Sequence, residues 1–351
     1  MKLLQLDLVD YRCFGKASLD FRDPGTKEPS NLIVLVGPNG SGKSSVLQAI
    51  AGSIGALAGS YGADPLLLSD VRDGAAFAKV GVTWIDGPLG PGAGSRGVIF
   101  NELAMVRVGC QADGRALAPG VQRLPGPDSA LGAWLHLVMR ETVTQVGLIL
   151  YFDVFRILPH SSVAGPNLTL VVKDRIHGAL APTVGRQGGL HPRYAQLRQW
   201  IVNLDYQRVK EKADRSCDLP AWDHLTQTLD TLFAPYRFDR VDERFDVLFQ
   251  TPTGRVPLGA ISDGYRSLFV IATELLLRLS LCTATPSEML TQEAVCLVDE
   301  IDVHLHPTLQ GRIIPALRTL FPNVQFIVTT HSPLVVASVE PHQVFRLEGV
   351  E

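Results

Sequence analysis

The sequence predicts an α/β fold whose core is a mostly parallel sheet. Two observations predict this core: the apolar run 32–36 leads straight into a glycine-rich loop and a helical pattern, and the last third of the chain alternates helices with apolar strands. The first thirty residues instead alternate apolar and polar side chains. That alternation indicates an antiparallel β hairpin or small sheet ahead of the glycine-rich loop.

Composition and charge exclude several classes of protein. The chain has 351 residues, 46% of them hydrophobic, which suffices for one large core or two smaller ones. A formal net charge of −3 provides no overall field for holding DNA or an anionic membrane, so any nucleic-acid contact requires a local patch. The five cysteines lie far apart, which argues against a zinc site or disulfide framework. The chain lacks a signal-peptide pattern and an apolar run of about 20 residues, so we expect a cytoplasmic protein without membrane insertion.

The glycine-rich loop is typical of a phosphate-binding P-loop. It reads Gly-Pro-Asn-Gly-Ser-Gly-Lys-Ser-Ser from Gly37 to Ser45. Glycine at its first and sixth positions lets backbone N–H groups curl around a polyphosphate, and the next helix points its positive end at the anion. The residues predicted to bind the phosphates are Gly37, Asn39, Gly40, Ser41, Gly42, Lys43, Ser44 and Ser45.

Two adjacent carboxylates follow a second apolar strand. The strand is Ala294–Val298 and the carboxylates are Asp299 and Glu300, which is the form of a Walker B motif. We expect Asp299 to hold Mg²⁺ together with the hydroxyl of Ser44, and Glu300 to polarise the attacking water. Acidic residues also end buried strands without any catalytic role, but the upstream P-loop favours the catalytic interpretation.

Two more polar segments are candidates for the same site. His331 follows the apolar strand 324–328, and ligands of open α/β sheets bind at the carboxyl ends of strands, so this histidine is a candidate contact for the terminal phosphate. Ser262 and Gly264 open a strongly apolar helix, whose free N–H groups would make a second anion site. The alternatives are an ordinary surface histidine and plain N-capping by the serine.

The middle of the chain predicts a second β region and a helical insert. Strands are expected at 77–85 and 98–106, an exposed loop over 112–127, and two amphipathic helices between Tyr194 and Phe233. The charged side chains of these helices are typical of a solvated face and only sometimes contact DNA. One strand over 237–250, turned back at 251–254, is expected next. The expected division is 1–160 for the N-terminal half of the core, 161–254 for the insert and 255–351 for the C-terminal half.

Together these motifs resemble an ABC-type ATPase head, a P-loop NTPase fold, of the SMC, RecF and OLD-like branch. The resemblance covers residues 1–60 and 255–351 and has five elements in the family's order: Tyr11–Phe14 for the N-terminal hairpin, Gly37–Ser45 for the P-loop, Ile261–Arg266 for the signature, Asp299–Glu300 for Walker B and Thr330–Ser332 for the H-loop. Residues 301–307 resemble the D-loop of small bacterial defence-associated ATPases of the AAA_21 and AAA_15 kind.

The resemblance implies that two heads sandwich two ATP molecules with Mg²⁺. Ser262 and Gly264 of one head would cap the phosphate held by the P-loop of the other, giving an ATP-dependent homodimer, and Lys43, Glu300 and His331 would be the catalytic residues. The sequence has Asp263 and Tyr265 where transporter signatures have glycine and glutamine. No glutamine follows the apolar strand 148–152, where a Q-loop belongs, although Gln145 precedes it.

The resemblance implies a DNA-maintenance or anti-phage defence machine. The last motif lies close to residue 351, so we expect any nuclease to be a separate effector protein, and contact with DNA or RNA stays open. Two alternatives belong to other classes. One is the nucleotide-binding subunit of an ABC transporter, and the other is an ATP-gated clamp or sensor that hydrolyses slowly.

Overall fold

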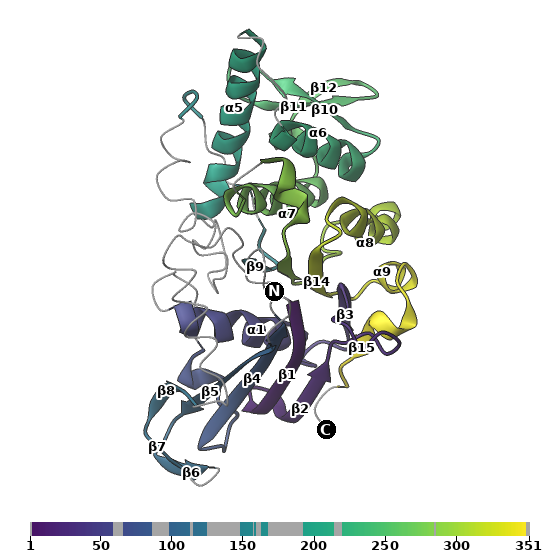
Figure 1. Ribbon diagram of the computed structural model, residues 1–351. Coiled ribbons are helices and arrows are strands. Elements are labelled where there is room, and N and C mark those ends of the chain that lie inside the picture. The colour runs from purple at the N-terminus through teal and green to yellow at the C-terminus, as the bar shows by residue number, and fades with distance from the viewer. Residues whose placement is uncertain are drawn as a thin grey trace.

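A computed structural model shows how the elements are arranged (Figure 1). The residues that it describes are 2–58, 66–85, 98–112, 115–124, 148–156, 158, 163–167, 192–213, 220–283 and 286–348. Gln145, which precedes the expected Q-loop strand, lies outside these residues.

The core sheet is parallel, as the sequence predicts. Its strands, in spatial order, are β15 (Val344–Arg346), β3 (Leu32–Val36), β14 (Val324–Thr329), β13 (Ala294–Val298) and β9 (Leu148–Phe152). All four neighbouring pairs are parallel. Strands β9, β13 and β14 are buried over their whole length, because both faces of the sheet are covered, and this explains their continuous apolar runs.

A second, antiparallel sheet precedes and flanks the core. Its strands, in spatial order, are β2 (Phe14–Asp20), β1 (Lys2–Tyr11), β4 (Phe77–Ile85), β5 (Val98–Val106) and β8 (Gly120–Arg123). The expected N-terminal hairpin and both later strands are therefore confirmed. The helix after the P-loop, α1 (Lys43–Ala58), contacts strands of both sheets and lies between them (Figure 1).

The exposed loop expected over 112–127 is wrong for part of that segment. Strand β8 joins the antiparallel sheet by pairing with β5, and β7 (Arg115–Leu117) pairs with β6 (Cys110–Ala112) in a two-stranded ribbon. Leu117 of β7 and Leu124 are buried there in one cluster with Ala104 and Val106 of β5. The cluster depends on contacts between segments that are separate in the sequence. The polar and turn-forming residues of this stretch therefore did not indicate that it would form strands.

One buried glutamine joins the two sheets. Gln325 of β14 is 0% exposed within an otherwise apolar strand. Its Oε1 accepts the Leu3 N–H at 2.7 Å, and its Nε2 donates to the Leu3 carbonyl at 3.0 Å and to the Ser30 carbonyl at 2.8 Å. Strand β1 shifts its register with β4 between Leu3 and Gln5, next to the backbone groups that the glutamine binds. The side chain thus provides hydrogen-bond partners for backbone groups next to the irregularity in the β pairing.

Replacing Gln325 with leucine is expected to destabilise the fold by about 2–5 kcal/mol, because the Leu3 N–H and carbonyl would stay buried without these partners. The midpoint of urea unfolding measures the change. Gln250→Leu is the matched control, since this exposed side chain donates only a 3.3 Å bond to the Thr251 carbonyl. Equal midpoints for the two variants would show that the glutamine does not hold the sheets together.

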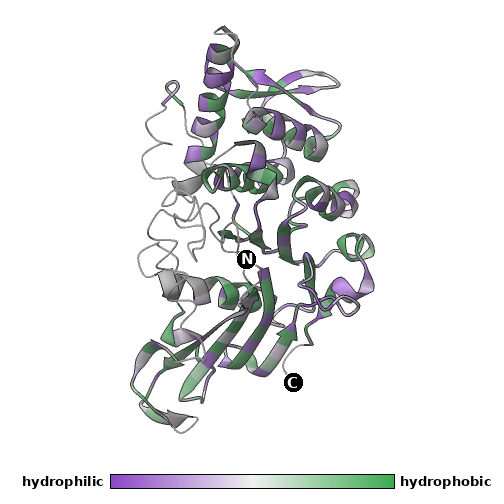
Figure 2. Cartoon of the chain, in the orientation of Figure 1, coloured by the Kyte–Doolittle hydropathy of each residue, from purple (hydrophilic) through white to green (hydrophobic). Residues whose placement is uncertain are grey.

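The helices gather on the other side of the core sheet (Figure 1). They are α5 (Pro192–Ala213), α6 (Pro220–Phe233), α7 (Asp263–Leu281), α8 (Pro307–Leu320) and α9 (Pro333–Ala337). Helices α5 and α6 confirm the two helices expected between Tyr194 and Phe233. Figure 2 shows α7 as apolar along most of its length, which agrees with its burial from Ser267 through Leu279. Among the described residues, no helix is both long and apolar enough to cross a bilayer.

A three-stranded antiparallel sheet follows α6 in the chain. It consists of β10 (Arg237–Val241), β11 (Val247–Thr251) and β12 (Gly254–Pro257), so the single strand expected over 237–250 is wrong. The Asp242 carboxylate accepts the N–H groups of Arg244 at 2.9 Å and Asp246 at 2.8 Å, which builds a turn between the first two strands. The expected turn at 251–254 separates β11 from β12.

Candidate active site

The P-loop connects β3 to α1 and depends on its glycines. The backbone is left-handed at Gly37, Gly40 and Gly42, with φ values of 158°, 80° and 92°. A Cβ at Gly37 would also lie 2.4 Å from the Leu347 carbonyl oxygen, and one at Gly42 would lie 2.4 Å from the ring of Phe14. Two of the glycines are therefore required both by the turn and by the space around it.

Lys43 lies at the base of this loop and is only 7% exposed. Its Nζ donates to the carbonyls of Gly37 at 2.9 Å and Pro38 at 2.8 Å, so the ammonium group lies against the loop. Burial lowers the pKa of Lys43, and the charges of Asp299 and Glu300 act in the opposite direction. The structure therefore brings the P-loop lysine within electrostatic reach of both Walker B carboxylates.

The loop also fits a polyphosphate ligand. The Ser41 hydroxyl is buried and has no hydrogen-bond partner among the described residues, which is unusual for a buried polar group. Asn39 and Gly40 are exposed at the tip of the loop, while Ser44 and Ser45 are half-buried in the first turn of α1. An unsatisfied hydroxyl, an adjacent cation and a helix N-terminus together form a site suited to an anion with several oxygen acceptors.

The Walker B carboxylates follow β13 in a tight turn. Asp299 is 4% exposed, and its Oδ1 accepts the Thr329 hydroxyl at 2.6 Å. The backbone N–H of Glu300 donates to the same Thr329 oxygen at 2.7 Å. Glu300 has a φ of 45°, a left-handed conformation that is costly for a residue with a Cβ. Thr329, at the end of β14, thus orients both acidic residues, a role that its position in an apolar run did not reveal.

The H-loop and D-loop are joined by side-chain hydrogen bonds. The Thr330 hydroxyl binds the Asp302 carboxylate, and the Ser332 hydroxyl donates to Gln310 at 2.7 Å. His331 lies between these anchored residues, is exposed, and makes no hydrogen bond with the residues that the structure describes. Its ring is therefore available at the carboxyl end of β14, where the sequence predicts it.

The signature segment begins α7. Ser262 occupies the N-cap position, but its exposed hydroxyl makes no capping hydrogen bond. Gly264 is buried, and a Cβ there would lie 2.4 Å from the carbonyl oxygen of His304 in the D-loop of the same chain. Tyr265 packs on the ring of Phe233 at 5.3 Å between centroids, which fixes the start of α7 against α6. The signature glycine thus allows close packing of α7 on the D-loop.

Arg12 of the N-terminal hairpin contacts the P-loop helix. Its Nε donates to Asp70 at 2.9 Å, while its Nη1 donates to the Ser45 hydroxyl at 3.3 Å and also binds the Gln48 side chain. Gln48 in turn donates to the Tyr151 hydroxyl at 3.5 Å. The hairpin resemblance located this arginine, but no sequence pattern indicated its contacts with α1.

Arg156 is a second contact that the motifs did not reveal. It follows β9 in the place where the Q-loop was expected and is 4% exposed. Its Nη1 donates to the Asp299 carbonyl at 2.6 Å and its Nη2 to the Glu300 carbonyl at 3.0 Å. The strand predicted to lead into the Q-loop therefore places a guanidinium behind the Walker B turn.

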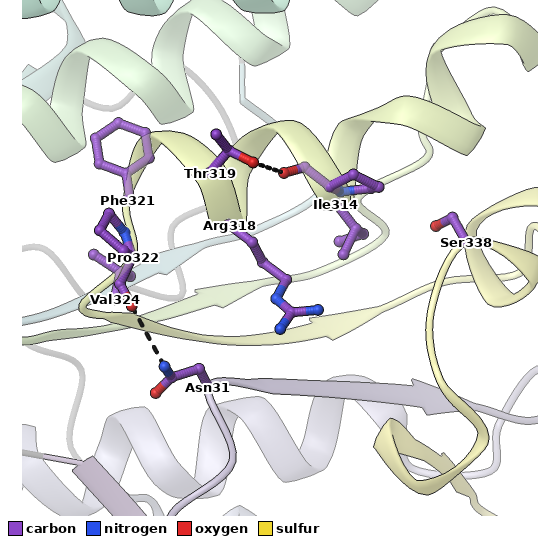
Figure 3. A pocket seen from close by; sticks show the side chains of 9 residues that line it. Asn31, Ile314, Arg318, Thr319, Phe321, Pro322, Val324 and Ser338 are labelled. Carbon is purple, nitrogen blue, oxygen red and sulfur yellow. Dashed lines mark hydrogen bonds between the residues drawn. The ribbon is translucent and has the colours of Figure 1, made fainter.

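A pocket of about 460 Å³ lies at the opposite edge of the core sheet (Figure 3). Asn31 and Val324, near the starts of β3 and β14, line it together with Arg318 of α8. None of the predicted site residues lines this pocket. The nucleotide motifs instead meet at the carboxyl ends of β3, β13 and β14, which in a parallel sheet lie along one edge.

Two family models match the ends of the chain. The AAA_23 model, described as "AAA domain", matches residues 5–74, which include the N-terminal hairpin and the P-loop. The AAA_21 model, described as "AAA domain, putative AbiEii toxin, Type IV TA system", matches residues 225–337, which include the signature, Walker B and both following loops. These are the two regions that carry the motifs.

Curated relatives match over short segments. The "Retron Ec83 probable ATPase" of Escherichia coli is 38% identical over 89 residues, which is 25% of this chain and 16% of the relative. The "Septu protein PtuA" of Bacillus thuringiensis is 30% identical over 114 residues, which is 32% of this chain and 29% of the relative. The chain thus spans less than a third of the length of either relative.

Solved structures match over almost the whole chain. A structure of the Smc head domain with an extended coiled coil, bound to the C-terminal domain of ScpA from Pyrococcus furiosus, has a TM-score of 0.56 at 15% identity and covers 100% of this chain and 94% of that one. An SmcHead bound to the C-winged helix domain of ScpA has a TM-score of 0.52 at 16% identity, covering 97% and 92%. Two parts of the chain therefore match AAA domain models, and the fold is similar to that of Smc head domains.

Proposed function

We propose that the chain binds ATP with Mg²⁺ and hydrolyses it at this edge of the core sheet. The observation that carries the proposal is that the P-loop and the Walker B turn follow β3 and β13 at the same edge of the parallel sheet, so that a phosphate-binding cation and two carboxylates lie at one edge. Lys43 and the loop N–H groups would hold the β- and γ-phosphates, and the buried hydroxyl of Ser41 would find its acceptor there.

Asp299 and Ser44 would hold the magnesium ion. A carboxylate and a hydroxyl are oxygen ligands of the kind that Mg²⁺ prefers, and the bound ion neutralises charge that develops on the phosphates. Thr329 keeps the Asp299 carboxylate oriented by donating to its Oδ1. Glu300 then accepts a proton from the attacking water, and exposed His331 donates to the terminal phosphate.

We further propose that two copies of the chain close around ATP. The support is Ser262, whose exposed hydroxyl makes no cap and leads a helix of 19 residues with its positive end free for a partner's phosphate. Gly264 would act through its backbone N–H, because its α-carbon packs against its own D-loop. Hydrolysis would remove the bridging phosphate and open the pair.

The biological setting that we propose is an anti-phage defence complex with a separate effector, such as a nuclease. The support is that sequence relatives are named for retrons and for Septu. An effector that acts on DNA or RNA fits the same setting. The transporter and sensor alternatives gain no specific support from the described residues.

Two measurements test the nucleotide-dependent dimer. We expect phosphate release with Mg-ATP, and a doubling of the mass in light scattering when a non-hydrolysable ATP analogue is added. Ser262→Arg is expected to abolish the doubling, because a bulky cation would block the helix tip, while nucleotide affinity stays within about twofold. The control is Ser338→Arg, which lines the pocket at the opposite edge of the core sheet and should dimerise normally. A Ser262→Arg variant that still dimerises with the analogue would overturn the sandwich.

A further inference from the structure

Arg156 joins three segments of the chain with one guanidinium group. Its Nε donates to the Ser267 hydroxyl of α7 at 2.8 Å, and its Nη1 and Nη2 donate to the carbonyls of Asp299 and Glu300 at 2.6 and 3.0 Å. Nη1 also donates to the Asp153 carbonyl at 2.6 Å, which closes the turn after β9. The guanidinium thus lies between the signature helix and the Walker B turn.

The contacts require an arginine. A planar guanidinium can donate to two successive carbonyls and, from another edge, to a third oxygen. A lysine ammonium has three donors on one nitrogen atom and cannot reach all of these acceptors at once. The two carbonyls belong to the turn in which Glu300 has its left-handed φ of 45°. The Glu300 carbonyl also accepts the Val303 N–H at 3.0 Å, so the guanidinium and the turn hold the same oxygen. A strained turn persists only where its surroundings fix it.

The other end of the contact lies on the signature helix. Ser267 lies in α7 about one turn beyond Ser262 and Gly264, and α7 is buried from this serine onward. A shift at the start of α7, such as contact with a partner's phosphate would cause, would therefore move the Ser267 hydroxyl with the helix. The guanidinium would follow through its 2.8 Å hydrogen bond and would carry the shift to the backbone of the Walker B turn.

We propose that Arg156 is a positioning residue that couples the position of α7 to the orientation of the Glu300 carboxylate. The inference rests on the proposed function and deepens it: the rate of hydrolysis depends on Arg156, while the affinity for ATP does not. Arg156 does this at the end of β9, where the sequence supplies no Q-loop glutamine. Binding of a partner's phosphate at the signature would thereby change the backbone position of the Walker B turn in the same head.

The first test separates turnover from binding. Arg156→Lys is expected to lower kcat about 10- to 100-fold, the cost of a small misplacement of a catalytic group, with KM and ATP affinity within about twofold. Ser267→Ala should lower kcat in the same direction, and the double variant should be no slower than Arg156→Lys alone, because the two residues act in series. Additive losses, or a loss of ATP affinity equal to the loss of kcat, would contradict the coupling.

Arg278→Lys is the matched control. Like Arg156, Arg278 is buried, but it lies in α7. Its Nε donates to Glu274 of the same helix at 2.9 Å and not to the Walker B turn. This variant should lower the melting temperature at least as much as Arg156→Lys and leave kcat unchanged. If both lysine variants lower kcat in proportion to their melting temperatures, Arg156 has only a structural role.

Hydrogen exchange decides the question without turnover. In the nucleotide-free protein, Arg156→Lys and Ser267→Ala should both speed the exchange of amides 299–305, and Arg278→Lys should not. Faster exchange in neither of the first two variants would overturn the proposal. A wild-type chain that releases no phosphate would instead refute the proposed function, and the exchange experiment would still report on the contact between α7 and the turn.

Discussion

Glu300→Gln is expected to lower kcat for ATP hydrolysis by about 10² to 10⁴-fold, the usual contribution of a positioned general base. The amide keeps the shape of the side chain and the Thr329 hydrogen bond to the backbone N–H, so nucleotide contacts survive. ATP then persists between the two heads, and the variant should accumulate as an ATP-bound dimer. Phosphate release and light scattering with Mg-ATP measure the two effects.

Glu288→Gln serves as the control for this experiment, since Glu288 is exposed in a short helical turn before β13. It should hydrolyse ATP and return to the monomer at the wild-type rate. A Glu300→Gln protein that hydrolyses ATP normally would remove this residue from the mechanism. A variant that is inactive but stays monomeric with saturating Mg-ATP would support Glu300 as the general base and would refute the ATP-bound dimer.

Lys43→Ala is expected to weaken ATP binding by about 10- to 100-fold, the worth of charge-assisted hydrogen bonds to the phosphates. The lysine is already buried against the carbonyls of Gly37 and Pro38, so little reorganisation precedes its contact with the ligand. The loss should appear in the dissociation constant of a fluorescent ATP analogue, and turnover at low ATP should fall with it.

Lys16→Ala is the matched control, because Lys16 is exposed in β2. It should bind the analogue as the wild type does. A melting temperature for Lys43→Ala close to that of the wild type would show that the lost affinity is not a loss of folding. Unchanged affinity in Lys43→Ala would exclude this lysine from the nucleotide site.

The parts of the site that the sequence predicts are encoded in short runs. The P-loop and the Walker B pair each consist of an apolar strand followed directly by functional residues, so spacing alone locates them. The parallel core sheet was predictable for the same reason, since strands buried on both faces are continuous apolar runs. Their placement at one edge of the sheet then follows from the parallel order.

The residues that the sequence did not reveal act over long separations. The hydrogen bond of Arg156 to Asp299 spans 143 positions, and that of Gln325 to Leu3 spans 322. No local periodicity reports such contacts, because each depends on how distant strands are placed. The break between β10 and β11 was missed for a different reason: the apolar alternation continues through the turn, and Phe245 occupies a left-handed position there.

The absence of a side chain at residue 264 has a mechanical consequence. With no room for even a methyl group between α7 and the His304 carbonyl, these two segments are in direct backbone contact. In the proposed dimer, contact of a second copy with the start of α7 would therefore act directly on the backbone of the D-loop. Such a direct contact would let the nucleotide bound at one site affect the nucleotide bound at the other.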